Sequence, residues 1–66
     1  MDVIVNGERR DLAPGTTVAD LVRSLTDATG GVAVAVNDEV VPKAAWSGTP
    51  VSAEDRVDVL TAVQGG

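Results

Sequence analysis

The chain has 66 residues, the size of one small domain, and it carries no cysteine and no histidine. Disulfide bonds, thiolate nucleophiles and thiolate metal sites are therefore excluded, and the side chain that most often acts as a general base at neutral pH is missing. The net charge of −5 disfavours nucleic acid and anionic membranes as partners. Thirteen valines against a single aromatic residue, a tryptophan, favour a β-sheet with an aliphatic core.

The N-terminal segment predicts a β-hairpin. Residues 2–6 alternate and are rich in β-branched side chains. Asn6-Gly7 is the strongest short-range hairpin signal, because a type I′ turn needs a positive φ at both central residues. Residues 8–12 return as a second strand, and their charges are typical of a strand at the edge of a sheet. A proline-glycine pair then ends this strand in a turn.

The next segment predicts an amphipathic helix over residues 18–28. Its apolar side chains recur at i, i+3, i+4 and i+7 and form one face, made of Val18, Leu21, Val22 and Leu25. Thr17 is a favourable N-cap, and Asp20 occupies the position of the acid in a capping box. We expect Gly30-Gly31 to end the helix, because glycine readily adopts the left-handed conformation of a helix cap.

Three further strands are expected in the second half of the chain. Residues 32–36 alternate valine and alanine, and residues 40–41 form a short strand after a polar turn. Residues 43–46 predict a single helical turn ending at Trp46, whose indole we expect to pack against the sheet. Residues 56–62 alternate again and form the last strand.

These elements have one economical packing, an α+β fold in which one helix lies across one face of a mixed sheet of four to five strands. The first and last strands lie parallel in the middle, because the elements between them supply the long connection that a parallel pair needs. The valines expected on the core side of the sheet are Val3, Val5, Val34, Val36, Val41, Val57 and Val59. Residues 1–62 form this domain, and residues 63–66 form a flexible tail.

The other face of the last strand predicts a small apolar surface. Alternation leaves Leu60 and Ala62 pointing away from the helix, across from Ala35. A single exposed leucine needs no explanation. A leucine on a flat, alanine-rich face just before the C-terminal Gly65-Gly66 indicates a docking surface for a partner protein.

No cluster of side chains in the sequence supports catalysis or metal binding by the chain itself. The hydroxyl groups have no histidine to activate them, and the acidic pairs at 38–39 and 54–55 lie in predicted turns without further ligands. The remaining reactive group is the carboxylate of Gly66, at the end of a backbone strip without side chains. Strand-like residues begin at Asp2 and no apolar run approaches the roughly 20 residues of a membrane span, so we expect a soluble, cytoplasmic monomer.

The order and spacing of these segments resemble the ubiquitin-like β-grasp fold and, within it, the ThiS family of sulfur carriers. The resemblance covers essentially the whole chain and rests on residues 5–8, 17–22, 34–37, 40–46 and 55–59, followed by Gly65-Gly66. One departure is Glu54, where that family usually has glycine before the aspartate. This departure concerns the turn before the last strand.

The resemblance implies a carrier rather than an enzyme, with no bound cofactor. In such a carrier a ThiF- or MoeB-type enzyme, consuming ATP, adenylates the C-terminal carboxylate, here Gly66, and sulfur from a cysteine desulfurase or a rhodanese then replaces AMP. The resulting thiocarboxylate gives its sulfur to thiazole synthase, ThiG, for the thiazole ring of thiamin. Gly65, Gln64 and Val63 would thread the partners' active sites, since glycine has no Cβ and permits unusual φ and ψ.

Two other functions remain open at the level of sequence. The first is a sulfur carrier for another acceptor, such as a MoaD-type carrier for molybdopterin or a carrier for cysteine synthesis. The second is a ubiquitin-like modifier joined to lysines through Gly66, or a plain interaction domain with the same fold.

Overall fold

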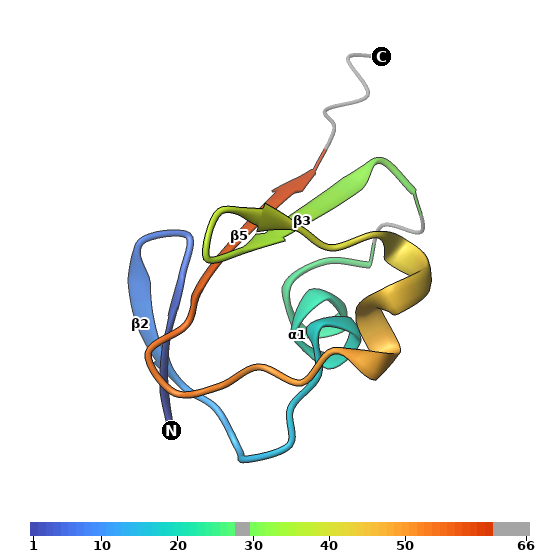
Figure 1. Ribbon diagram of the computed structural model, residues 1–66. Coiled ribbons are helices and arrows are strands. Elements are labelled where there is room, and N and C mark those ends of the chain that lie inside the picture. Colours follow the sequence, from blue (N-terminus) through green and yellow to red (C-terminus); the bar gives the residue numbers. More distant parts are fainter. Residues whose placement is uncertain (28–29, 62–66) are drawn as a thin grey trace.

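The structure, a computed structural model, describes residues 1–27 and 30–61, and in these ranges one α-helix packs on a five-stranded mixed sheet (Figure 1). The strands are β1 (Asp2–Val5), β2 (Glu8–Asp11), β3 (Val32–Val36), β4 (Glu39–Val40) and β5 (Arg56–Thr61). Helix α1 spans Val18–Leu25, and a 3₁₀ helix, η1, spans Lys43–Gly48. The predicted α+β class and β-grasp architecture are confirmed.

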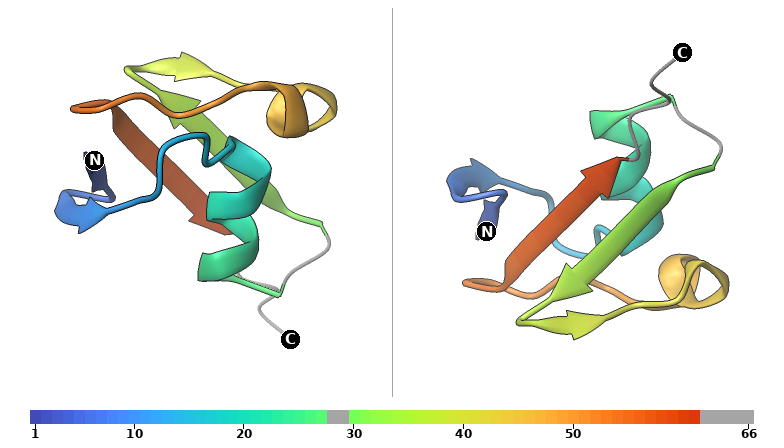
Figure 2. Two further views of the ribbon diagram at one scale, coloured as in Figure 1. Left: turned by 90° about the horizontal axis from the view of Figure 1, so that it is seen from below. Right: turned by 90° about the horizontal axis from the view of Figure 1, so that it is seen from above.

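The strand order in the sheet is β2-β1-β5-β3-β4, with the first and last strands at its centre. β1 and β5 are parallel, as predicted, and pair Ile4 with Arg56 and Val5 with Val57. β3 runs antiparallel to β5 on its other side. Figure 2 shows α1 on one face of these central strands, with β4 and η1 toward one side of the molecule and the β1–β2 hairpin toward the other.

The N-terminal hairpin agrees with its sequence signal. Asn6 and Gly7 both adopt a positive φ, at 50° and 82°, which is the geometry of a type I′ turn. Every residue of β2 is exposed, and β2 forms one edge of the sheet. Charged side chains on an edge strand discourage pairing with further chains, so this edge is protected.

The start of α1 was predicted correctly, whereas its end was not. The Asp20 N–H donates to Thr17 Oγ1 and the Thr17 N–H donates to Asp20 Oδ2, both at 3.2 Å, which completes the capping box. The helix ends at Leu25, three residues before the predicted end. Thr26 is the C-cap, with an extended backbone, and its N–H donates to the Val22 carbonyl. The helix ends early because threonine and the following aspartate have a lower helix propensity than the preceding residues.

The glycine pair does not cap the helix, which corrects the prediction. Gly31 does adopt a positive φ, 69°, but it directly precedes β3 and lies well beyond the end of α1. Its conformation therefore turns the chain into β3 rather than ending the helix. Residue 28, the last of the predicted helix, and residue 29 lie outside the described residues.

Strand β4 begins one residue earlier than predicted, at Glu39. The turn before it consists of Asn37 and Asp38 alone, which adopt positive φ values of 52° and 69° and allow Val36 to pair with Glu39. Asparagine and aspartate tolerate this conformation better than other non-glycine residues. Val41 follows the strand, and its N–H still donates to the carbonyl of Val34 at 2.9 Å.

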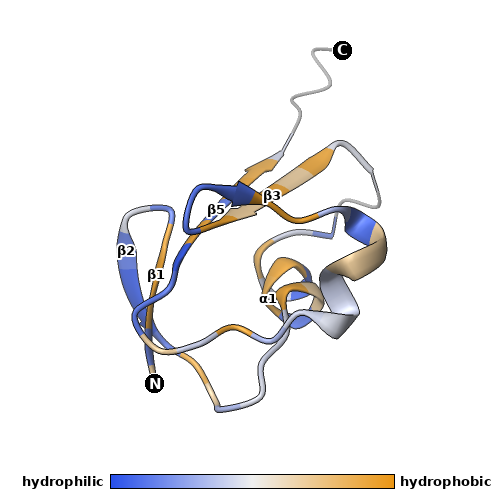
Figure 3. Ribbon diagram, in the orientation of Figure 1, coloured by the Kyte–Doolittle hydropathy of each residue, from blue (hydrophilic) through white to orange (hydrophobic). Residues whose placement is uncertain are grey.

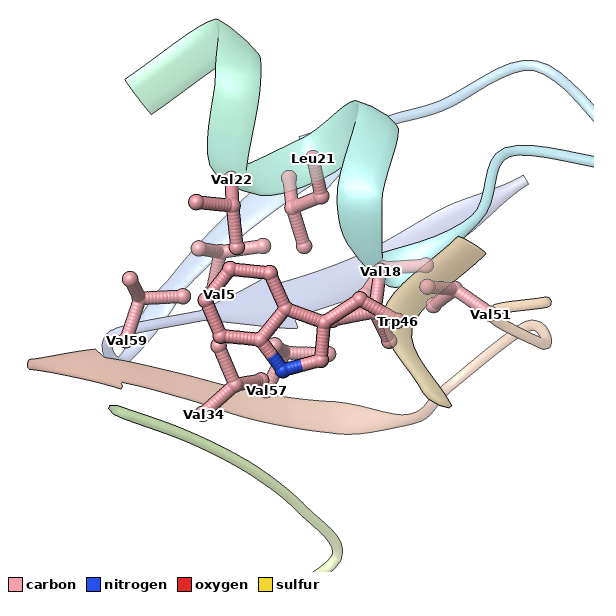
Figure 4. Packing of buried hydrophobic residues seen from close by; sticks show 10 residues of the cluster. Val5, Val18, Leu21, Val22, Val34, Trp46, Val51, Val57 and Val59 are labelled. Atoms are coloured by element: carbon pink, nitrogen blue, oxygen red, sulfur yellow. The ribbon is translucent and has the colours of Figure 1, made fainter. Parts of the chain in front are cut away.

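The core between α1 and the sheet is almost entirely aliphatic. Its buried residues are Val3, Val5, Val18, Leu21, Val22, Val34, Trp46, Val51, Val57 and Val59. Val36 and Val41, expected in the core, are only partly buried against it, while Val51, which was not among the expected core residues, is buried. The expected packing of Trp46 is confirmed. The residue is 8% exposed and its ring lies among the buried valines (Figure 4). Its indole N–H donates to the Val41 carbonyl at 2.9 Å.

Candidate functional site

The candidate site begins where β5 ends. The predicted reactive residue Gly66 and the predicted tail residues Gly65, Gln64 and Val63 lie outside the described residues, as does Ala62 of the predicted docking surface. The last described residue is Thr61, at the end of β5. Five residues follow it in the sequence, and covalent geometry limits their reach to about 18 Å.

Strand β5 is held firmly in the middle of the sheet. It has a strand on each side, and its inward side chains Val57 and Val59 are buried under α1, as predicted. Its pairing with β3 continues to the last described residue, where Thr61 lies opposite Val32. The point from which the C-terminal segment leaves is therefore fixed relative to the rest of the domain (Figure 1).

Two turn asparagines also fasten β5 from its flanks. The Val59 N–H donates to Oδ1 of Asn6 at 2.8 Å, and the Arg56 N–H donates to Oδ1 of Asn37 at 3.0 Å. From the sequence, Asn6 was expected only to form a turn. Its second role joins residues 53 positions apart, and no local pattern in the sequence indicates such a pairing.

Leu60 is exposed on the outer face of the sheet, as predicted, with 70% of its surface accessible. The predicted neighbour was wrong, because Leu60 lies opposite Ala33, whereas Ala35 lies opposite Asp58. The inward valines explain this register. Val34 pairs with Val59 and Val36 with Val57, which places the valines of both strands under the helix.

One exposed apolar residue was missed. Val40 of β4 lies opposite Ala35 and is 74% exposed. The sequence could have predicted this exposure. Adjacent residues of a strand face opposite sides of the sheet, so Val40 should face outward if Val41 faces the core. We call the outer-face residues Leu60, Ala33, Ala35 and Val40 the outer apolar patch. Figure 3 shows that the end of β5 and the start of β3 are both apolar.

Charged residues surround this patch toward the hairpin. Asp58 lies on the same face of β5 as Leu60, and Arg56 forms an ion pair with Asp38 at 2.9 Å. Arg9 donates to Glu54 at 3.2 Å, and the hydrogen bond and charge of Glu54 raise the pKa of Arg9 above its usual value. An apolar surface with a charged rim is the arrangement found at many protein interfaces.

The described ranges contain no group of three or more histidine, cysteine, aspartate or glutamate residues that could hold a metal ion. In those ranges no buried side-chain nitrogen or oxygen atom lacks a hydrogen-bond partner. A shallow hollow between α1 and η1, lined in part by Val22, Arg23 and Trp46, lies on the helix side of the sheet, away from the outer apolar patch. Among the described helices, none is long and apolar enough to cross a membrane.

Comparison with known proteins agrees with this geometry. The model of the ThiS family matches residues 3–66. The sulfur carrier protein ThiS of Escherichia coli (strain K12) is 29% identical over 66 residues, which covers all of both chains. A thiazole synthase of Paramagnetospirillum magneticum is 32% identical over the same length, and the chain spans 20% of that protein.

Two solved structures of a thiamine biosynthesis protein from Geobacter metallireducens have the same fold. The crystal structure of this ThiS protein has a TM-score of 0.81 and 32% identity, and each chain is covered completely. The solution structure has a TM-score of 0.82 and 33% identity over all of this chain and 88% of the other. Because the family match extends over nearly the whole sequence, the chain belongs to the ThiS family of sulfur carrier proteins.

Proposed function

We propose that Gly66 is the residue through which this chain carries sulfur. The family's role is sulfur carriage in thiamin biosynthesis, so the chain acts as a carrier and not as an enzyme. In the proposed sequence the carboxylate of Gly66 attacks the α-phosphate of ATP, forms an acyl adenylate and releases pyrophosphate. The outer sulfur of a persulfide on the donor then attacks the acyl carbon and displaces AMP, and a thiol reduces the resulting acyl disulfide to leave the thiocarboxylate. The observation that carries this proposal is the family match, which runs through residue 66.

The physical chemistry of the tail supports this sequence. A carboxylate is a poor electrophile until it bears a good leaving group, and AMP is such a group. The activating enzyme must bring this carbon beside the α-phosphate of ATP in an enclosed site. Gly65 and Gly66 suit a narrow channel because they have no Cβ, and Val63 and Gln64 extend the reach of the tail beyond β5.

We further propose that the outer apolar patch docks on a ThiF- or MoeB-type adenylating enzyme. The patch lies on the same strand that leads to Gly66, so docking there directs the tail toward the enzyme. ThiG is the proposed sulfur acceptor, which is supported by the similarity of this whole chain to part of a thiazole synthase. The sulfur donor, a cysteine desulfurase or a rhodanese, completes the set of proposed partners.

Removal of Gly66 tests the carrier proposal. Intact mass is measured after incubation with the adenylating enzyme, ATP and a sulfur source. The full chain should gain the mass difference between one sulfur and one oxygen atom, and it should support thiazole formation when thiazole synthase is added. The chain without Gly66 should do neither. Thiazole formation by the shortened chain would refute the proposal, and larger conjugates would indicate a protein modifier instead.

Leu60→Asp tests the docking proposal separately. A charge at this large exposed apolar residue of the patch should weaken binding to the adenylating enzyme by about 30-fold or more, the loss expected for an interface hot spot. Ala44→Asp, an exposed change on η1, is the matched control and should leave the affinity unchanged. Both variants should keep the melting temperature of the native chain. Equal affinities for Leu60→Asp and the native chain would rule the patch out as a docking surface.

A further inference from the structure

Strand β5 is paired unequally along its two edges. On one edge β3 accompanies it to its last described residue, Thr61. On the other edge the register with β1 ends at the pair Val5–Val57. Asn6 then adds two final bonds, from its own N–H to the Val57 carbonyl at 2.9 Å and from the Val59 N–H to its Oδ1 at 2.8 Å. The end of β5 extends past the hairpin (Figure 2).

The backbone groups beyond Asn6 can be assigned from the alternation of the strand. The Asp55 carbonyl, the Val57 carbonyl and the Val59 N–H all bond toward β1 or Asn6. The same alternation points the Val59 carbonyl and both backbone groups of Thr61 toward that side. In the described part of the chain, the hairpin makes no hydrogen bond to β5 beyond the Val59 N–H. We call this stretch, residues 59–61 on the β1 side, the open edge of β5.

The open edge of β5 differs in charge from β2, the edge strand on the same side of the sheet. All four residues of β2 are charged, which protects that strand from pairing with other chains. Residues 59–61 carry no charge. If the C-terminal tail enters an enclosed active site, the end of β5 loses its water as well. Peptide groups removed from water need new hydrogen-bond partners, because a buried N–H or carbonyl without one is costly.

We propose that the open edge of β5 binds an extended backbone segment of the adenylating enzyme, which pairs with residues 59–61 as an additional strand. Strand addition of this kind obtains its affinity from main-chain hydrogen bonds. The contact is distinct from the outer apolar patch, because it uses backbone groups at an edge and not side chains on a face. This inference rests on the proposed function, since it takes the enzyme that receives the tail as the partner.

Thr61→Pro provides the first test. Proline removes the N–H that points to the open edge, whereas pairing with β3 uses the backbone groups of Asp58 and Leu60. Thr61→Val keeps the N–H and the shape of the side chain, so it is the matched control. The affinity for a purified ThiF-type adenylating enzyme should fall about tenfold or more for the proline variant and stay within about twofold for the valine variant.

Amide hydrogen exchange of the native chain provides a second test that does not depend on a variant. It is measured residue by residue by NMR, with and without a saturating amount of the same enzyme. Exchange at Thr61 should slow about tenfold or more in the complex, because its N–H gains a partner. Exchange along Glu8–Asp11 should stay unchanged, because the charged edge remains in water.

Three results would overturn the inference. The first is native affinity in Thr61→Pro, and the second is unchanged exchange at Thr61 in the saturated complex. The third is slowed exchange at Thr61 in the free chain at high concentration, which would make a second copy the occupant. If the native chain is still adenylated in these cases, the proposed function stands and only the strand pairing fails. A native chain that is neither bound nor adenylated would remove the proposed function itself.

Discussion

Four non-glycine residues adopt a positive φ in the described part of the chain, namely Asn6, Asn37, Asp38 and Glu54. Asparagine and aspartate tolerate this conformation well, and glutamate does so less. Glu54, with φ at 67°, lies in the turn before β5, at the position where the resemblance led us to expect glycine. Its N–H donates to the Asp2 carbonyl at 2.7 Å and its carboxylate accepts from Arg9, so both contacts hold the turn in place.

Substitutions at Glu54 should therefore separate the effect of backbone strain from the loss of the ion pair. Glu54→Val and Glu54→Gly both remove the ion pair, but valine is strained at a positive φ and glycine is not. Valine should lower the free energy of unfolding by about 1–2 kcal/mol more than glycine does. Urea denaturation measures the difference. Ala53→Val, in the same turn without a positive φ, is the control, and an equal loss there would contradict the role of strain.

Asn6→Gly and Asn37→Gly form a matched pair for the bonds that fasten β5. Each change keeps a residue suited to a positive φ and removes one side-chain acceptor, so each should lower the free energy of unfolding by about 1 kcal/mol or more. Asn37→Gly also removes the exposed donation from Asn37 Nδ2 to Asp55 Oδ1, at 3.0 Å. Only Asn6→Gly removes the partner of the Val59 N–H, so only this variant should speed hydrogen exchange at Val59 beyond the global change. Equal acceleration in both variants would contradict the assignment.

At the scale of single elements, the cap of α1 makes a prediction about pH. The backbone N–H of Thr17 and, next, its side chain hydrogen-bond to Asp20 and lower the pKa of that carboxyl group. A lowered pKa in the folded state means that the ionised form stabilises the fold. This contribution is complete above the unfolded pKa, about 3.9, and is lost as the pH falls through the lower folded value.

Asp20→Asn should therefore melt at a lower temperature than the native chain at pH 7, since the amide keeps the shape but not the charge. The difference in melting temperature should shrink as the pH is lowered below about 4 and vanish in stronger acid. Thermal unfolding followed by circular dichroism measures both chains across this range. A difference that stays constant with pH would show that the charge is not what stabilises the helix start.

The elements also show which features a sequence can predict. The start of α1 was predictable because Thr17 and Asp20 are local signals, and so was the Asn6-Gly7 turn. The end of α1 was not predictable in this way. Gly30 and Gly31 are a stronger stop signal in the sequence than Thr26, yet the helix ends before Thr26. Alternation predicted which side chains of β3 and β5 face the helix. The register between the two strands depends on how valines from both fit under the helix. Such packing is a tertiary property that no local pattern encodes.

At the scale of the whole molecule, stability depends on a small core. A domain of this length typically has a free energy of unfolding of about 3–10 kcal/mol. Trp46→Ala removes the largest buried side chain and should cost about 3–5 kcal/mol, which leaves little net stability. Leu60→Ala, at an exposed position, should change the free energy of unfolding by less than about 0.5 kcal/mol. Denaturation of both variants measures the contrast, and similar losses would contradict the assigned packing of Trp46.

Some features of the candidate site could be predicted from the sequence, and others depend on the assembled sheet. Residue types alone directed attention to Gly66, because the sequence contains no histidine, no cysteine and no cluster of ligands. The exposure of Leu60 followed from its place in an alternating strand. The contribution of Val40 and the side-chain bond of Asn6 to β5 depend on which strands become neighbours. Only the assembled sheet brings these residues together.

The central position of β5 also has a kinetic consequence. The hairpins β1–β2 and β3–β4 each form between residues close in sequence, so they can assemble within microseconds. Only β5 joins them, and its pairing with β1 closes the long loop from Ile4 to Arg56. Contacts between distant residues slow folding, since the loop entropy is lost before those contacts form. We therefore expect the pairing of the last strand to limit the folding rate, and the complete sheet to form in the same step that fixes the strand leading to Gly66.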